Sequence, residues 1–596
     1  MSDNKNMNKI VLAQINTIAG DIEYNSTKIK ENIKKAQDIN ADLVIFPELC
    51  LMGYPFGDIF VRHPSIIERQ IDELNKLAKY TKNITALIGF AEPTEYSHQK
   101  PFYNSVAILQ NEKIINIIRK TLIPNYCEFN EHRYFEPAKE TAELLELNGE
   151  KFGIIICEDS FNDKTFFGKK CVYEIDPIEE LMKKKPDTII NCSCSPTRTG
   201  KEHLKNALFS SIAKKYKVNY IYVNQASYAD NLVFDGTSRV YNSNGKITLR
   251  ANSFEEDFAI CENYAGEVKN MPSGMEKKID IKSFSLNYEY DLDRTYKSIL
   301  YGIKEYFWKN GFKKAVLGLS GGLDSTISAV LLADALGKEN VWGISMPSKI
   351  TSKESKNDAE MLAKNLGINF LEIPLADSIE QMKITLNDTF KEINTDKYST
   401  STTIENLQAR TRATILWSVS NEFKQMLPIA TSDKSEAYIG YATVNGDMSG
   451  GFAPIADVTK TKLFALGDFL NRTREVKNAI PQTILEKPPG AELKINPKTG
   501  KTVCAEEDNM PYEFLDEIVW QIENNGFGFT KLLKHKFYYE KTHTLEKEQK
   551  EEWIKKFFKK MQFATYKWHI IPPSVITDIH SINNVEYHQP IISKLY

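Results

Sequence analysis

The sequence predicts two α/β units joined by a short linker. Residues 1–265 contain short β-branched runs separated by stretches with helical spacing, which is typical of a layered α/β domain. Residues 288–596 alternate strand and helix in a way that favours a doubly wound, mostly parallel sheet. Residues 266–287 lack a clear period of either kind, and we expect the linker there.

Size, charge and cysteine content narrow the class of protein. A chain of 596 residues is too long for one ordinary domain. Its formal net charge of -3 gives no support to a general nucleic-acid or membrane-surface role. No segment reads as a signal peptide or as a membrane span. The 8 cysteines have no regular paired spacing, so we expect reduced thiols and a cytoplasmic protein.

The individual elements follow from these periods. In the first unit we expect strands at Lys9–Ile15, Asp42–Phe46, Ile84–Gly89, Ser105–Leu109, Ile114–Ile118, Phe152–Ile156, Thr188–Asn191 and Asn219–Asn224. Helical stretches lie between several of them, such as Ser26 to Ile39 and Lys201 to Tyr216. In the second unit we expect a first helix from Asp291 to Asn310, followed by alternating strands and helices at Ala315–Leu319, Ser325–Leu336, Val341–Met346, Ser355–Leu366 and Phe370–Ile373. The lysine-rich stretch Glu546 to Lys560 is predicted to be a solvated helix face.

The most specific motif is Ser320-Gly321-Gly322-Leu323-Asp324-Ser325, between an apolar strand and a helix start. Backbone N–H groups at such a turn converge on one point and can bind phosphate oxygens, while a neighbouring carboxylate can hold magnesium. The Gly-Lys-Ser/Thr ending of a Walker A loop is absent. The motif resembles the pyrophosphate-binding loop of N-type ATP pyrophosphatases. The simpler alternative is an ordinary glycine turn capped by serine.

Later segments narrow this resemblance to the NAD synthetase family. Glu405–Arg412, Ala430–Glu436 and Gly440–Gly451 occur in that family's order, and the resemblance covers about Tyr288 to Pro573. It implies ATP and Mg²⁺ as partners, with these residues: Asp324 and Glu436 for magnesium; Ser320, Gly321, Gly322, Asp324, Ser325, Arg410 and Thr431 for ATP; Asp447 and Lys460 for the dinucleotide substrate. Two positions depart from the family pattern, Gly490 in place of a hydroxyl residue and Trp568 in place of arginine.

In the first unit, Cys157 ends an apolar strand, and Glu48 and Lys120 each follow another strand. A thiol needs a base before it can attack an amide carbon, and a nearby cation stabilises the oxyanion that forms. Alone, each residue fits an inert cysteine or a solvated charge better. Together they resemble the catalytic triad of the nitrilase superfamily, over about Lys9 to Lys246, which implies an αββα sandwich.

The same resemblance implies a glutamine pocket near the triad. Glu131 would be a second, positioning carboxylate, and Tyr126 and Ser195 would belong to the pocket. Cys192 and Cys194 form an isolated Cys-x-Cys without a second pair of ligands, which makes a zinc site improbable.

A nitrilase-like glutaminase followed by an NAD synthetase resembles the glutamine-dependent NAD synthetase family. The resemblance implies ATP-dependent amidation of nicotinic acid adenine dinucleotide (deamido-NAD) to NAD, with glutamine as nitrogen donor and AMP, pyrophosphate and glutamate as products. It further implies a homo-oligomer, at least a dimer through the synthetase half. We also expect a water-excluding passage for ammonia.

Three alternatives share part of this pattern. A guanylate or asparagine synthetase would normally carry a different type of glutaminase. A transfer-RNA-modifying enzyme would be expected to have a basic face or cysteine pairs in its second half, where Cys504 is the only cysteine. A non-catalytic scaffold is disfavoured because the triad candidates and the phosphate loop are all present.

Overall fold

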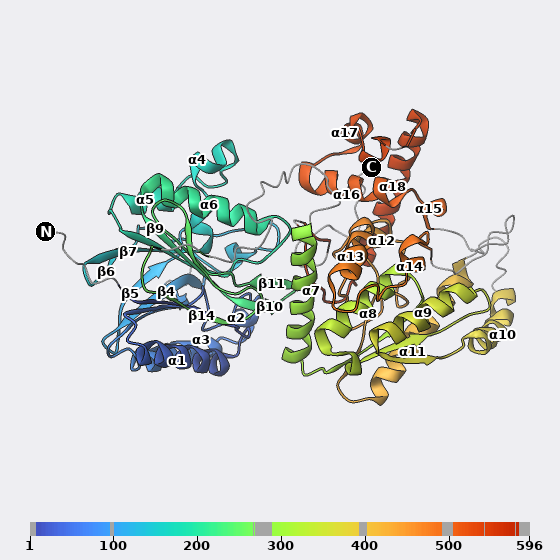
Figure 1. Ribbon diagram of the computed structural model, residues 1–596, viewed down its shortest axis with the longest axis horizontal. Coiled ribbons are helices and arrows are strands. Elements are labelled where there is room, and N and C mark those ends of the chain that lie inside the picture. Colours follow the sequence, from blue (N-terminus) through green and yellow to red (C-terminus); the bar gives the residue numbers. More distant parts are fainter. Residues whose placement is uncertain are drawn as a thin grey trace. The chain divides into compact units, whose positions relative to one another are not determined.

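The computed structural model describes residues 8–95, 100–265, 268, 289–392, 402–490, 505–541, 543–578 and 580–582. The chain divides into two compact units, Met1–Ile279 and Asp280–Tyr596 (Figure 1). The predicted linker, except residue 268, and Cys504 lie outside the described residues, so the linker boundaries stay a prediction. None of the described helices is both long and apolar enough to cross a bilayer.

Two six-stranded mixed sheets form the centre of the first unit. The first has the order β14-β1-β2-β3-β4-β5, with bounds Asp257–Cys261, Ile10–Gln14, Leu43–Ile45, Thr85–Pro93, Phe102–Gln110 and Lys113–Arg119. The second has the order β13-β12-β9-β8-β7-β6, with bounds Ile247–Arg250, Arg239–Tyr241, Asn219–Asn224, Thr188–Ser193, Glu150–Ile156 and Leu145–Leu147. In each sheet three consecutive central strands are parallel, β1 to β3 and β7 to β9.

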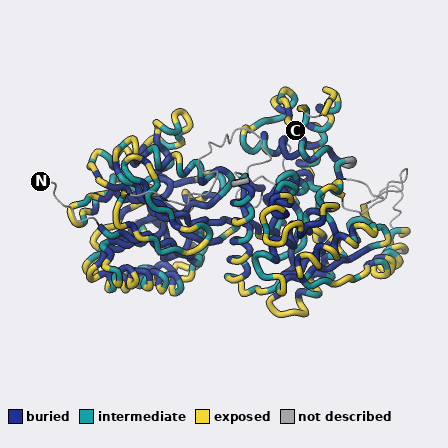
Figure 2. Tube along the Cα trace, in the orientation of Figure 1, coloured by how far each residue is buried: buried dark blue, intermediate teal, exposed yellow. Residues whose placement is uncertain are grey.

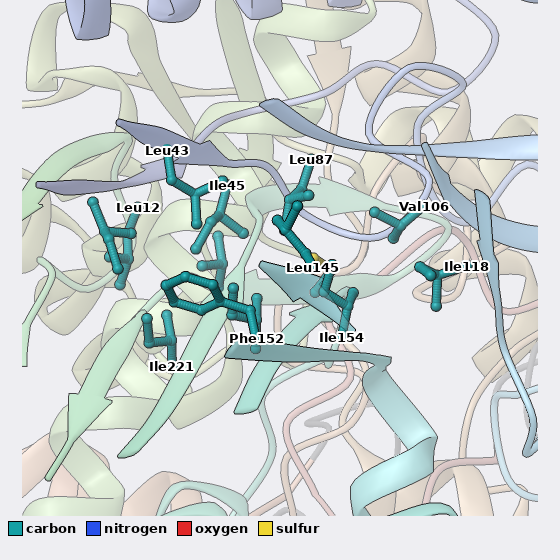
Figure 3. Close-up of a cluster of buried hydrophobic side chains, with 14 of the residues drawn as sticks. Leu12, Leu43, Ile45, Leu87, Val106, Ile118, Leu145, Phe152, Ile154 and Ile221 are labelled. Atoms are coloured by element: carbon teal, nitrogen blue, oxygen red, sulfur yellow. The ribbon is translucent and has the colours of Figure 1, made fainter. Parts of the chain in front are cut away.

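The two sheets bury one apolar layer between them. Leu12, Ile45 and Leu87 of the first sheet belong to the same cluster as Phe152 and Ile221 of the second (Figure 3). Helices lie outside the sheets: α1 (Ile22–Asp38) and α3 (Ser65–Ala78) beside the first, α5 (Pro177–Met182) and α6 (Lys201–Tyr216) beside the second (Figure 1). Strands covered on both faces are almost wholly buried (Figure 2). The expected αββα sandwich is confirmed.

The expected strands of this unit are all present, with shifts at their ends, and β9 and α6 have the expected bounds. The short strands that follow β9 were not predicted. They comprise the hairpin β10 (Ala226–Ala229) and β11 (Leu232–Asp235), and the sheet strands β12, β13 and β14. Two very short helices, α2 (Ile59–Arg62) and α4 (Lys164–Phe167), complete the unit.

The second unit is built on a four-stranded sheet in which all neighbours are parallel. Its order is β17-β16-β15-β18, with bounds Asn369–Glu372, Val341–Ser345, Lys314–Gly318 and Met426–Pro428. The surrounding helices are α7 (Glu289–Lys309), α8 (Leu323–Leu336), α9 (Lys353–Leu366), α10 (Ala376–Glu392) and α11 (Thr402–Glu422). The expected parallel sheet is confirmed; its edge strand β18 was not predicted.

Helices also form a second core after the sheet. This cluster draws on α12 (Lys434–Ile439), α16 (Tyr512–Asn525), α17 (Phe529–Lys534) and α18 (Lys547–Trp568), and α13 (Lys460–Thr473), α14 (Gln482–Glu486) and α15 (Ala505–Asp508) lie between them in sequence. The prediction of a solvated face for Glu546 to Lys560 is only partly right. The lysines of α18 alternate with Ile554, Phe557 and Phe558, which are buried in the cluster.

Candidate active sites

In the first unit, Glu48, Lys120 and Cys157 lie together at the ends of β2, β5 and β7. The Lys120 Nζ lies 2.7 Å from Glu48 Oε1. All three side chains are buried. Gly89 allows this arrangement, because a Cβ at that position would lie 2.3 Å from the backbone nitrogen of Leu49, next to Glu48.

Lys120 lies between two carboxylates. Its Nζ donates to Glu131 at 2.8 and 2.9 Å as well as to Glu48. Burial disfavours the ammonium, yet Glu131 and Glu48 hold the pKa of Lys120 well above its ordinary value. Tyr54 donates to Glu131 at 3.0 Å, and Asn104 donates to Glu48 at 2.7 Å. Lys120 is therefore protonated, and the hydrogen bonds hold its ammonium group in one orientation.

Cys157 occupies a constrained turn. Its φ is 45°, in the left-handed region that non-glycine residues seldom adopt. Asn191 holds the turn by accepting from the Cys157 N–H at 2.7 Å and donating to its carbonyl at 3.3 Å. Burial, and then the Glu48 charge, raise the pKa of the Cys157 thiol well above its usual value. The resting group is the thiol, so attack requires a base.

Beside the thiol lies a group of polar side chains that the sequence indicated only in part. Tyr126 donates to both oxygens of Glu158, at 2.8 and 2.9 Å, and Tyr173 donates to Glu158 at 3.1 Å. Burial raises the pKa of Glu158 and the charge of Lys201 opposes the shift. Ser195 is held through its backbone by Asn224. Glu158, Tyr173 and Lys201 were not predicted as site residues; the adjacency of Glu158 to Cys157 was the one available signal.

In the second unit, the 320–325 loop follows β15 and includes the first turn of α8, which begins at Leu323. Gly321 has a φ of 76°, and a Cβ there would lie 2.2 Å from the carbonyl oxygen of Ser355. The hydroxyls of Ser320 and Ser325 are 3.0 Å apart, and Ser325 also donates to the Gly322 carbonyl. The loop therefore needs glycine at 321, and Ser325 stabilises its shape.

This loop forms one wall of a cavity of about 560 Å³. The predicted residues that line it are Ser320, Gly321, Gly322, Asp324, Thr431, Glu436, Asp447 and Lys460. Ser325 and Arg410 are not among its lining residues. The Arg410 side chain is exposed and donates to the Val444 carbonyl, whereas Arg412 of the same helix lines the cavity.

An acidic cluster with a central lysine lies next to the loop. Oxygens of Asp324, Asp433 and Glu436 all lie within 4.8 Å of one another. Lys460 Nζ is 2.7, 2.6 and 3.0 Å from these three carboxylates. Burial disfavours its charge, but the carboxylates hold the pKa of Lys460 well above its ordinary value. Asp433, which also caps α12 by accepting from the Glu436 N–H, was not predicted.

The two departures from the family pattern have different places. Gly490 lines the cavity, and the residues after it, 491–504, lie outside the described part of the chain. Trp568 is a buried core residue whose indole donates to the Ala437 carbonyl at 2.8 Å. Its neighbour Lys567 lines the cavity and donates to the carbonyls of Gly440 and Ala442.

These sites define a class: an amide-hydrolysing unit of the nitrilase type on the same chain as a nucleotide-binding ligase unit. Two family models match accordingly, carbon-nitrogen hydrolase over residues 9–271 and NAD synthase over residues 295–563. The glutamine-dependent NAD(+) synthetase of Synechocystis sp. is 38% identical over 86% of this chain and 88% of its own length. That of Thermotoga maritima is 37% identical over the same shares.

Solved structures of the same kind cover both units. A glutamine-dependent NAD+ synthetase from Acinetobacter baumannii, in complex with adenosine diphosphate, is 28% identical with a TM-score of 0.70, over 98% of each chain. One from Cytophaga hutchinsonii, at 21% identity and a TM-score of 0.78, shares the fold over 98% of each chain. The chain belongs to the glutamine-dependent NAD(+) synthetase family.

Proposed function

We propose that this chain makes NAD by amidating deamido-NAD with ammonia that it releases from glutamine, consuming ATP and producing AMP, pyrophosphate and glutamate. The observation that carries the proposal is the presence of two complete sites on one chain. One is the buried Glu48–Lys120–Cys157 group. The other is a glycine-rich loop that lines a cavity together with an acidic cluster, to which Asp324 of the loop itself belongs.

In the first site, Glu48 removes the proton of the Cys157 thiol as the sulfur attacks the glutamine side-chain amide. Lys120 donates to the oxyanion of the tetrahedral intermediate. The carbon–nitrogen bond then breaks, Glu48 returns the proton to the departing nitrogen, and ammonia leaves a thioester on Cys157. Water, deprotonated by Glu48, hydrolyses the thioester to glutamate and restores the thiol. The permanent charge of Lys120 suits a role in oxyanion binding rather than proton transfer.

Glutamine recognition is assigned to the polar group beside the thiol. The substrate carries an ammonium and a carboxylate at its α-carbon, and Glu158 and Lys201 offer the opposite charges. Burial raises the pKa of Glu158, and Lys201, Tyr126 and Lys120 favour its ionised form. Tyr126 and Tyr173 orient Glu158, and Glu131 orients Lys120. Ser195 contributes to the wall of the pocket.

In the second site, the loop N–H groups and Ser320 bind the phosphates of ATP, with Gly321 and Gly322 allowing close approach and Ser325 holding the loop. The solved relative in complex with adenosine diphosphate supports this assignment of an adenine nucleotide to the second unit. Thr431, which lines the cavity, contributes to ATP binding. Arg410 was expected to contact ATP, but Arg412 is the arginine of α11 that lines the cavity. Both arginines are therefore candidates for the charge contact with ATP.

The donor set of the acidic cluster suits Mg²⁺. Asp324 and Glu436 offer hard carboxylate oxygens, and Asp433 adds a third within 4.8 Å. Bound there, the ion would neutralise charge on the ATP phosphates as pyrophosphate leaves. Lys460 supplies positive charge at the same point. Asp447, fixed by accepting from the Thr443 N–H at 2.7 Å, binds deamido-NAD.

The chemistry of this site follows from the two substrates. The nicotinate carboxylate of deamido-NAD attacks the α-phosphorus of ATP, which forms an adenylate and releases pyrophosphate. Ammonia then attacks the activated carbonyl and displaces AMP, giving the amide of NAD. An acyl adenylate hydrolyses in water, so we expect the bound substrates to exclude water from the cavity.

The direct test is product formation with a panel of candidate nitrogen acceptors. With ATP, Mg²⁺ and glutamine, deamido-NAD should give AMP, pyrophosphate and NAD in equal amounts. Aspartate and xanthosine monophosphate should give none, which separates this activity from asparagine and guanylate synthetases. AMP formation with either of these and not with deamido-NAD would overturn the proposal.

We also propose that the protein is cytoplasmic and forms at least a dimer through its synthetase unit. Cys50, Cys157, Cys171, Cys192, Cys194 and Cys261 are thiols in the described part of the chain, which suits a reducing compartment. The proposed assembly rests on family membership. Light scattering of the purified chain should give at least twice the mass of 68.1 kDa.

A further inference from the structure

Asp159, two residues after the candidate nucleophile, makes an unusual set of hydrogen bonds. It is 2% exposed. Its Oδ2 accepts from the Ile156 N–H at 3.0 Å. Its Oδ1 accepts from the N–H groups of Thr121 at 3.0 Å and Leu122 at 2.7 Å. One buried carboxylate therefore accepts from three backbone donors on two distant parts of the chain.

These donors flank the two key side chains. Ile156 immediately precedes Cys157 at the end of β7, in the second sheet, and Thr121 immediately follows Lys120 at the end of β5, in the first sheet. A carboxylate that only capped the short helix beginning at Cys157 would need the bond to Ile156 alone. The additional pair of bonds joins one sheet to the other at the point where the nucleophile and the lysine emerge.

Other contacts fix each side separately. On the first sheet, the Lys120 N–H donates to the Asn104 carbonyl, and the Ala138 N–H donates to the Lys120 carbonyl, both at 2.8 Å. On the second sheet, Asn191 bonds both backbone groups of Cys157. Each side is thus rigid, and Asp159 bonds the backbone of both. From this geometry we infer that Asp159 is a positioning residue that sets the separation of the Cys157 sulfur and the Lys120 ammonium.

The inference rests on the glutaminase function proposed above and adds a residue to it. Asp159 does not carry out a chemical step. It acts by keeping the Lys120 ammonium at the right distance and angle from the attacking Cys157 sulfur. Small errors in this geometry reduce the rate strongly. Its loss should therefore slow the chemical step of glutamine hydrolysis while leaving glutamine binding, which we assign to other side chains, largely intact.

The test compares Asp159→Asn with Asp163→Asn in the full-length protein. Asp163 is also 2% exposed and also accepts from a backbone N–H, that of Phe166. It caps α4 and, within the described residues, makes no bond to the segments that carry Cys157 and Lys120. In Asp159→Asn, kcat for glutamine hydrolysis should fall roughly 10- to 100-fold while KM changes less than about threefold. In Asp163→Asn, kcat should stay within about twofold of the unaltered protein.

Two further measurements keep the outcomes distinct. NAD synthesis from added ammonium should be equal in both variants and the unaltered protein, since it does not use this site. Hydrogen exchange of β7 and β8 reports whether the Asp159→Asn variant keeps its fold. An unchanged kcat, or a rise in KM without loss of kcat, in the folded variant would overturn the role of Asp159. So would an equal loss in Asp163→Asn. Absence of glutamine hydrolysis in the unaltered protein would instead refute the proposed function.

Discussion

Each site centres on a buried lysine surrounded by carboxylates. Lys120 lies between Glu48 and Glu131, and Lys460 contacts Asp324, Asp433 and Glu436. Isolated buried charges are costly, and they persist only when paired and hydrogen-bonded. In the first site two carboxylates flank one lysine. In the second, three carboxylates exceed one lysine, which leaves room for a further cation.

Asp433 allows this excess charge to be tested. In Asp433→Asn, the amide oxygen can still accept from the Glu436 N–H and cap α12, but one negative charge is lost beside Lys460. We expect the Mg²⁺ concentration for half-maximal synthesis to rise about tenfold or more. A Mg²⁺ titration of ammonium-dependent synthesis measures this concentration. An unchanged midpoint would show that Asp433 is not part of the metal site.

Sequence patterns identified side chains that lie just after strands or inside a glycine-rich turn. Glu48, Lys120, Cys157 and Asp324 were predicted in this way, because each is marked by its local neighbours. Asp159 and Lys201 carry no such mark, since their importance depends on contacts with residues distant in sequence. Arg410 and Arg412 are two positions apart on α11 and therefore point to different faces of the helix. The sequence cannot say which face meets the cavity, because packing against other elements decides that.

At the scale of elements, short turns at strand ends hold the working groups. The loop after β15 depends on Gly321, whose positive φ and contact with the Ser355 carbonyl exclude a side chain. The turn after β7 places Cys157 in the left-handed region at a cost that Asn191 offsets. The strands themselves were predictable from apolar runs, whereas the short edge strands such as β18 were not, because three residues carry too little periodicity.

Gly321→Ala tests the loop. The added Cβ would lie 2.2 Å from the Ser355 oxygen, so the loop must shift away from its phosphate-binding shape. We expect ammonium-dependent NAD synthesis to fall about 100-fold while glutamine hydrolysis by the other unit persists. Gly526→Ala is the matched control, with a φ of 60° but nothing within 4 Å of the added atom. It should cost about 1 kcal/mol of stability and little activity. Equal activity loss in both variants would count against the loop assignment.

A buried carboxyl on helix α16, that of Glu523, makes the stability of the fold depend on pH. Burial raises the pKa of Glu523 to about 7, and the charges of Asp578 and Asp457 act in the same direction. Lys434 and Tyr438 favour the ionised carboxylate and oppose this rise. The folded state therefore binds this proton more tightly than the unfolded state, and the group adds stability as the pH falls from about 7 toward 5. Glu523→Gln should remove roughly 1–3 kcal/mol of that gain.

Tryptophan fluorescence can follow this unfolding in the intact chain, because all 6 tryptophans lie between Trp308 and Trp568, in the second unit. Glu513→Gln, on the same helix, is the control and should keep the pH dependence of the unaltered protein. A Glu523→Gln variant with an unchanged difference between pH 8 and pH 5 would show that this carboxyl does not titrate there.

At the scale of the whole molecule, two folds each carry one half of a reaction. The sandwich supplies a nucleophile between its sheets, and the parallel sheet presents a phosphate loop at the carboxyl end of β15, where such folds bind ligands. Both fold classes were predictable from the sequence and were confirmed. The identity of the product was not predictable from residue chemistry; it came from family resemblance, which the relatives at 37–38% identity now support.

The most direct test of two separate sites on one chain is NAD synthesis by Cys157→Ala with each nitrogen source. The variant lacks only a buried thiol in the first unit. With glutamine, synthesis should fall at least about 1,000-fold, since the variant lacks the thiol that forms the thioester. With saturating ammonium, the rate should stay within about twofold of that of the unaltered protein. Synthesis from glutamine at an undiminished rate, or equal loss with both nitrogen sources, would contradict the two-site scheme.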